Sequence, residues 1–173
     1  MNEATKPLTR VRDAGASDYA AIRDLLREGD AFHRQMSLFG WHSEPQDYPR
    51  EAYDVVMADP AAIVLIAEHN VALAGFLRSA VVEQPRTRVR AHRHFLIVHE
   101  IVVAEAFRGL GIGTALTAAI KAEARKRALE NVELNVHAAN IAARAFYRRE
   151  DFVEESLRLR YDVAPRPGTG GQP

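Results

Sequence analysis

The stretch FRGLGIGTAL, residues 107–116, is the segment of the sequence that indicates the fold most specifically. It follows an apolar run and opens into a helical pattern, although Gly109, Gly111 and Gly113 each weaken a helix. Glycine allows positive φ and lets a ligand approach the backbone without a Cβ in the way. The start of a helix leaves N–H groups without partners, and its dipole favours negative charge. A strand, this turn and a helix in that order therefore predict an anion-binding turn.

Two common phosphate-binding motifs do not match this turn. A Walker loop has a lysine between its last glycine and the Ser or Thr, whereas Thr114 follows Gly113 directly. The dinucleotide fingerprint has the spacing G-x-G-x-x-G, whereas the spacing here is G-x-G-x-G. From the turn alone, an ordinary glycine-rich connection between a strand and a helix is the alternative.

On both sides of the turn, the hydrophobic period alternates between that of strands and that of helices. The predicted strands are residues 8–12, 62–68, 71–82, 95–103, 132–136, 152–153 and 157–163, with a tight turn at 69–70. The predicted helices begin after a cap at Ser17 or Asp18, break near Gly29 and resume around His33, and then cover residues 50–58, 113–128 and 140–149. This order predicts one α/β (α+β) domain over residues 8–163, with flexible ends at 1–7 and 164–173.

The composition excludes several classes of protein. The chain is 47% hydrophobic, and its 23 basic and 23 acidic residues balance, so we expect neither a nucleic-acid nor a membrane partner. The absence of cysteine excludes disulfides and a cysteine nucleophile, and no metal site is predicted. No apolar run approaches the roughly 20 residues that span a bilayer. The first ten residues lack the apolar stretch of a signal peptide, so a cytoplasmic protein is expected.

Three segments together resemble one known family. RGLGIG, residues 108–113, resembles the R/Q-x-x-G-x-G/A motif of the GNAT superfamily of acyl-CoA-dependent N-acetyltransferases. The run HEIVVAEAF at 99–107 resembles that family's fourth strand, and NIAARAFY at 140–147 resembles its N-x-x-A-x-x-[FL]-Y segment. The resemblance implies a mixed, largely antiparallel sheet of about 6–7 strands flanked by about 4 helices. At the level of motifs it covers residues 95–155.

The resemblance implies acetyl-CoA as the cofactor. The amides of the glycine turn, with Arg108, would hold its pyrophosphate, and the backbone of the preceding strand would pair with the pantetheine arm as an added strand does. Tyr147 would donate a proton to the leaving thiolate. The implied cofactor-binding residues are Val102, Val103, Arg108, Gly109, Leu110, Gly111, Ile112, Gly113, Thr114, Asn140 and Tyr147.

The resemblance also implies a catalytic base on the strand before the turn, where His99 and Glu100 are the ionisable residues of the apolar run 95–103. Alternation sends them to opposite faces unless a bulge intervenes. Burial would raise the pKa of Glu100 and make its carboxylate a better base near neutral pH, so Glu100 is favoured. His99 is the other candidate, because the ordinary pKa of an imidazole already lies near neutral pH. Proton transfer through water and a purely structural ion pair are alternatives for each residue.

The acceptor is expected to be a primary amine of a small molecule, peptide or protein. By resemblance, His33, Phe39 and Trp41 would shape its pocket. The alternative function is a coenzyme-A sensor without turnover. The sequence leaves the oligomeric state open, with a homodimer as one of the states it allows. One departure concerns the family's Y-x-x-x-G-F segment, because Asp151 replaces the glycine. Aspartate tolerates the left-handed conformation better than most residues, so we expect the turn to persist.

Overall fold

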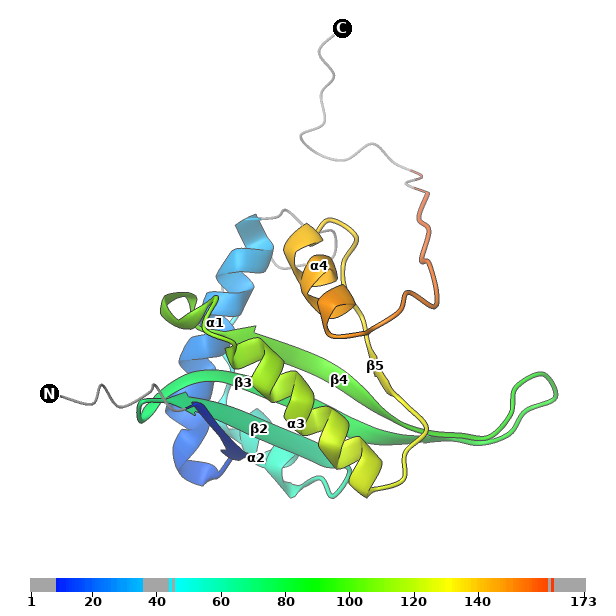
Figure 1. Cartoon of the computed structure of the whole chain (residues 1–173), viewed down its shortest axis with the longest axis horizontal. Coiled ribbons are helices and arrows are strands. Elements are labelled where there is room, and N and C mark those ends of the chain that lie inside the picture. The colour runs from blue at the N-terminus through cyan, green and yellow to red at the C-terminus, as the bar shows by residue number, and fades with distance from the viewer. Residues whose placement is uncertain (1–8, 36–43, 45, 162, 164–173) are drawn as a thin grey trace, which may run out of the picture.

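The computed structural model describes residues 9–35, 44, 46–161 and 163. The predicted flexible ends lie outside these residues, and so do Phe39 and Trp41. In chain order the elements are β1 (Thr9–Asp13), η1 (Ala16–Asp18), α1 (Tyr19–Gln35), α2 (Arg50–Ala58), β2 (Ala62–His69), β3 (Ala72–Gln84), β4 (Arg93–Val103), η2 (Glu105–Phe107), α3 (Ile112–Lys126), β5 (Val132–Leu134) and α4 (Ile141–Arg149) (Figure 1). None of the helices in these ranges is long and apolar enough to cross a membrane.

The sheet has the order β1-β2-β3-β4-β5, and only the β4–β5 pair is parallel. Apolar side chains of α3, such as Leu116 and Ile120, pack on one face of the sheet. Ile22 and Leu25 of α1 and Tyr53 of α2 pack on the other face. Figure 1 shows α3 lying along the sheet on the side opposite α1 and α2. The predicted mixed, largely antiparallel fold with four α-helices is confirmed.

The predicted number of strands was too high, because the described chain forms five. Residues 152–161 contain no strand, and Figure 1 shows this segment running away from the sheet after α4. Its apolar side chains after Phe152 are solvent-exposed, with Leu157 at 77% and Leu159 at 82%. Their period of two is typical of a strand, but a strand also needs a neighbour for its backbone hydrogen bonds, and this segment lies beside none.

The predicted break near Gly29 was also wrong, because α1 continues unbroken to Gln35. Gly29 serves packing in this helix. A Cβ added there would lie 3.2 Å from Cγ2 of Val102, so glycine lets α1 rest directly on β4. The predicted turn between β2 and β3 moves by one residue, to Asn70 and Val71, which have φ values of 47° and 65°. Two residues with positive φ are typical of a type I′ hairpin turn.

An ion-pair network joins the first strand to the start of α1. Asp18 accepts hydrogen bonds from the Gly15 amide at 2.7 Å and from Arg12 Nη1 at 2.9 Å. Arg12 also pairs with Glu68 of β2 at 2.8 Å. The Arg12 guanidinium holds the pKa of the Asp18 carboxyl below its ordinary value. Asp18, one of the two predicted caps, thus closes the turn that leads into α1.

Candidate active site

A β-bulge in β4 sets the direction of the two candidate bases. Arg78 of β3 lies opposite Glu100, whereas the next residue, Ser79, lies opposite Val98, so His99 is the extra residue. Val98 and Ile101 are three positions apart, yet both pack against the core on the α3 side. His99 and Glu100, which lie between them, therefore both face the α1 side. The bulge overrides the simple alternation that would have separated them.

Glu100 is already engaged by a basic residue. Its Oε2 lies 2.7 Å from Nε of Arg78, and both side chains are about one-third exposed. His99 is exposed, and its pKa is lowered from the ordinary value by partial desolvation and by the charge of Arg78. A lowered pKa keeps the imidazole neutral near pH 7, as a base requires. The geometry therefore supports His99 more than Glu100, the residue favoured from the sequence.

Helix α1 brings further ionisable groups to the side where the bulge points. Burial raises the pKa of Asp30, which interacts electrostatically with His33 and with Glu100. Burial lowers the pKa of His33, and His137, in the connection between β5 and α4, acts in the same direction. His33 lies in α1, which packs on the face of the sheet toward which the bulge points. Asp30 was missed from the sequence, although its i,i+3 spacing to His33 on one helix was a usable signal.

The strand that carries the bulge separates from its neighbour after residue 98. The parallel pairing of β4 with β5 runs from Leu96 to Val98, so the edge of β4 beyond Val98 is open on that side. The amide of Ala104 donates to the Ala74 carbonyl at 2.9 Å, which fixes the direction of the backbone groups in β4. By alternation, Val102 turns its N–H and C=O toward β3, and Val103 turns them toward the open edge.

The predicted pairing of an extended ligand with the backbone therefore fits Val103 and not Val102. The side chain of Val102 packs in the core between the sheet and α1. The carbonyl of Val103 faces outward, as shown by the hydrogen bond of 3.3 Å that it accepts from Nε of Arg108. Ile101 shares the outward orientation of Val103 by the same alternation.

The glycine turn has the backbone conformation that its sequence predicts. Gly109 and Gly111 have φ values of 78° and 81°, in the left-handed region. A Cβ added to either residue would meet no atom within 4 Å, so the space beside the turn is open. The first hydrogen bond inside α3 runs from the Ala115 amide to the Gly111 carbonyl at 3.0 Å. The amides of residues 112–114 therefore have no partner within the helix, as is general for the first turn of a helix.

The other residues of this motif serve packing as well. A Cβ added to Gly113 would lie 3.1 Å from Cζ of Phe146, so this glycine lets α4 approach α3 closely. The side chain of Ile112 is buried in the core, whereas that of Leu110 is exposed. Thr114 donates its hydroxyl to Oε1 of Glu150 at 2.6 Å, which links the start of α3 to the end of α4.

Tyr147 lies in α4, where its ring packs edge-on against Phe146 and Phe152. Burial raises its pKa to about 12, so the phenol stays protonated and can donate at neutral pH. The turn after it is formed as expected: Asp151 has φ 62°, and the Phe152 amide donates to the Tyr147 carbonyl at 3.0 Å. Asn140, predicted to contact a cofactor, caps α4 by accepting a hydrogen bond from the Ala143 amide at 3.0 Å.

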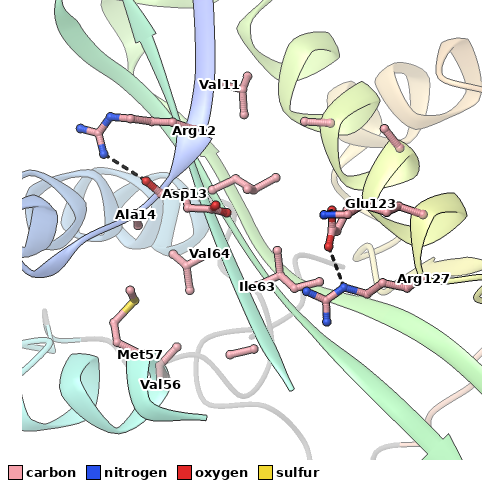
Figure 2. Close-up of a pocket in the computed structure, with 15 residues that line it drawn as sticks. Val11, Arg12, Asp13, Ala14, Val56, Met57, Ile63, Val64, Glu123 and Arg127 are labelled. Carbon is pink, nitrogen blue, oxygen red and sulfur yellow. Dashed lines mark hydrogen bonds and ion pairs between the residues drawn. The ribbon is translucent and has the colours of Figure 1, made fainter. Parts of the chain in front are cut away.

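The pocket drawn in Figure 2 lies at the opposite end of α3 from the glycine turn. Its volume is about 650 Å³, and its walls come from β1, β2, α2 and the second half of α3. An ion pair between Glu123 and Arg127, at 2.7 Å, borders it (Figure 2). The lining includes none of the predicted site residues, so this pocket is separate from the candidate active site.

The comparison with known proteins agrees with this geometry. A family model described as the acetyltransferase (GNAT) family matches residues 21–152, which include the bulge, the glycine turn and Tyr147. The chain belongs to this acetyltransferase family.

Solved structures show the same fold. A mutant of the BH1408 protein from Bacillus halodurans is 19% identical, with a TM-score of 0.82 over 90% of this chain and 99% of that one. The aminoglycoside acetyltransferase meta-AAC0020 from an uncultured soil metagenomic sample, in complex with sisomicin, is 18% identical, with a TM-score of 0.67 over 90% and 97%. The aminoglycoside N-acetyltransferase AAC(6')-Iy, in complex with CoA, is 14% identical, with a TM-score of 0.70 over 92% and 97%.

Proposed function

We propose that this protein transfers an acetyl group from acetyl-CoA to a primary amine. The observation that carries the proposal is the position of the left-handed turn at Gly109 and Gly111. It lies between the open edge of β4 and the first amides of α3, and the space beside it is free. A diphosphate needs a concave set of N–H donors that it can approach closely, and this turn supplies them.

The residues present fit coenzyme A in two respects. The turn, where a Cβ would occupy open space, would hold the diphosphate through its amides. The outward N–H and C=O of Val103 and Ile101 would pair with the amides of the pantetheine arm, as a sheet edge pairs with an extended peptide. When bound, acetyl-CoA supplies an acetyl group that is activated as a thioester. The CoA complex of AAC(6')-Iy, which shares the fold, supports this assignment.

Two side chains of this chain would handle the protons. His99, which has a lowered pKa and lies on the α1 side, would take the proton from the acceptor ammonium, directly or through water. Tyr147, which has a raised pKa, would give a proton to the departing sulfur. Glu100 is already paired with Arg78, so we assign it a structural ion pair beside His99 and no proton transfer.

We infer that the acceptor is a small-molecule amine. Asp30 lies on α1, the helix that packs on the face of the sheet toward which His99 points, and a carboxylate attracts an ammonium. The complex of the aminoglycoside acetyltransferase meta-AAC0020, which shares the fold, with sisomicin supports this inference. A panel of amines distinguishes a small-molecule acceptor from the amines of peptides and proteins.

Release of free thiol from acetyl-CoA across such a panel, which includes small amines, a lysine peptide and peptides with free N-termini, tests the proposal. We expect release that depends on an amine, with product mass increased by one acetyl group. Binding of coenzyme A without release by any amine would support the sensor alternative. Failure to bind coenzyme A would overturn both.

A further inference from the structure

One carboxylate of α1 holds the segment that leads into the glycine turn. Oε1 of Glu28 accepts a hydrogen bond from the Glu105 amide at 2.6 Å and lies 3.3 Å from Nη2 of Arg108. Glu105 is the first residue of η2, and Arg108 immediately follows this short helix. Glu28 thus contacts both ends of a segment from which it is separated by 77 residues at one end and 80 at the other.

The contact with the Glu105 amide replaces a missing local cap. The N-cap residue of η2 is Ala104, which has no side-chain acceptor and makes no side-chain capping bond. A carboxylate at the N-terminus of a helical turn satisfies one of its unpaired amides, and the charge strengthens this hydrogen bond. Glu28 therefore caps η2 from another helix and joins α1 to the connection between β4 and α3.

Arg108 also contacts an aromatic residue of α1, which lies one turn further along the helix than Glu28. The guanidinium carbon of Arg108 lies 5.5 Å from the ring centroid of Phe32, within the range of a cation–π contact. Glu28 and Phe32 are four residues apart and so share a face of α1. Together with the Val103 carbonyl, which accepts from Nε at 3.3 Å, they direct the guanidinium.

Helix α1 is well placed to transmit this restraint because it rests directly on β4. Gly29, next to Glu28, packs against Val102, where a Cβ would come within 3.2 Å. The backbone of the helix therefore lies directly against the strand whose open edge leads to the turn.

We propose that Glu28 is a positioning residue for the cofactor-binding turn, which it holds through the Glu105 amide and the Arg108 guanidinium. This inference rests on the proposed function, because the turn is taken to bind coenzyme A. Arg108, predicted from the sequence as a phosphate ligand, then acts as part of the clamp that fixes the turn. Loss of the clamp lets residues 105–111 sample other conformations, and the amides must be ordered again on binding.

The first test measures by calorimetry the binding of coenzyme A to the variants Glu28→Ala and Glu28→Gln. The control is Glu51→Ala, which replaces an exposed acidic residue of α2. Glu28→Ala should weaken binding about tenfold, because it removes a charged hydrogen-bond acceptor. Glu28→Gln keeps an acceptor for the Glu105 amide and should lose less, and Glu51→Ala should bind as wild type does. In a double-mutant cycle, the effects of Glu28→Ala and Arg108→Ala should be less than additive. Unchanged affinity in Glu28→Ala, whatever its thermal stability, would overturn the inference.

A second measurement separates this inference from the proposed function. Hydrogen exchange of the ligand-free protein should be faster over residues 105–111 in Glu28→Ala than in wild type, and unchanged over α2. Equal exchange over 105–111 would contradict the positioning role even if coenzyme A did not bind. Faster exchange in a protein that binds no coenzyme A would retain the clamp and reject the cofactor assignment.

Discussion

Gly113 of α3 and Phe146 of α4 are in direct contact, and a Cβ on Gly113 would lie only 3.1 Å from Cζ of Phe146. Phe146 precedes Tyr147, so this contact sets how closely the candidate proton donor approaches the helix that starts at the glycine turn. The hydrogen bond from Thr114 to Glu150 links the same two helices one turn later in α4. The turn and the candidate acid are thus held in one packed unit.

We expect Gly113→Ala to lower the free energy of unfolding by about 1 kcal/mol, because crowding of Phe146 outweighs the gain in helix propensity. The displaced α4 should also lower kcat. Denaturant unfolding and steady-state kinetics measure the two effects. The double variant Gly113→Ala, Phe146→Leu should recover stability, since leucine leaves room for the added methyl group. Wild-type stability and kcat in Gly113→Ala would contradict the packing argument.

Tyr147→Phe should lower kcat by about 100-fold, the size expected for loss of a general acid, and should leave the affinity for coenzyme A nearly unchanged. Since burial raises the pKa of Tyr147 to about 12, its ionisation should not lower kcat at any pH up to about 10. Kinetics of both proteins across this range provide the check. A variant with wild-type kcat would exclude Tyr147 as the donor.

The pH profile of kcat/KM should show an acid limb below the ordinary pKa of histidine, because desolvation and Arg78 lower the pKa of His99. Activity falls as the pH drops through this value, since the protonated imidazole cannot accept a proton. Arg78→Gln should move the limb to higher pH, and His99→Gln should remove it along with most activity. A limb that stays in His99→Gln would assign the base to another group, such as Glu100.

Stability at low pH should depend on Asp18. Because Arg12 lowers the pKa of Asp18 in the folded state, its stabilising contribution is fully present above the unfolded pKa, about 3.9, and is lost as the pH falls through the lower folded value. Asp18→Asn should therefore cost about 2 kcal/mol near pH 7 and progressively less below pH 4. Urea unfolding at several pH values measures the difference. A cost that is independent of pH would mean that the charge of Asp18 is not what stabilises the network.

The sequence was sufficient to predict the backbone conformation of the turns at the candidate site, because each turn motif carries its own local physics. Alternating glycines before a helix specify a left-handed turn, and Gly109 and Gly111 adopt it. Aspartate can replace glycine in a left-handed position, and Asp151 does so. Local patterns also located α2, α3 and α4 within a few residues, although Gly29 was misread as a break.

Features that depend on pairing between distant segments could not be predicted. The bulge at His99 follows from the register between β3 and β4, which no local pattern encodes. The contacts of Glu28 with Glu105 and Arg108 join segments almost 80 residues apart. Residues 157–161 have the period of a strand, but whether a strand forms depends on a neighbour that the sequence pattern does not reveal.

The most direct test of the central claim, that the glycine turn binds coenzyme A, is calorimetric titration of wild type, Gly111→Ala and Gly111→Val with coenzyme A. Gly15→Ala is the matched control, because Gly15 has negative φ and a Cβ there would make an ordinary contact of 3.8 Å. Thermal unfolding of each variant shows whether it is folded. We predict that wild type and Gly15→Ala bind equally, that folded Gly111→Ala binds at least tenfold more weakly, and that Gly111→Val shows no measurable binding. Wild-type affinity in both Gly111 variants, or no binding by wild type, would contradict the account.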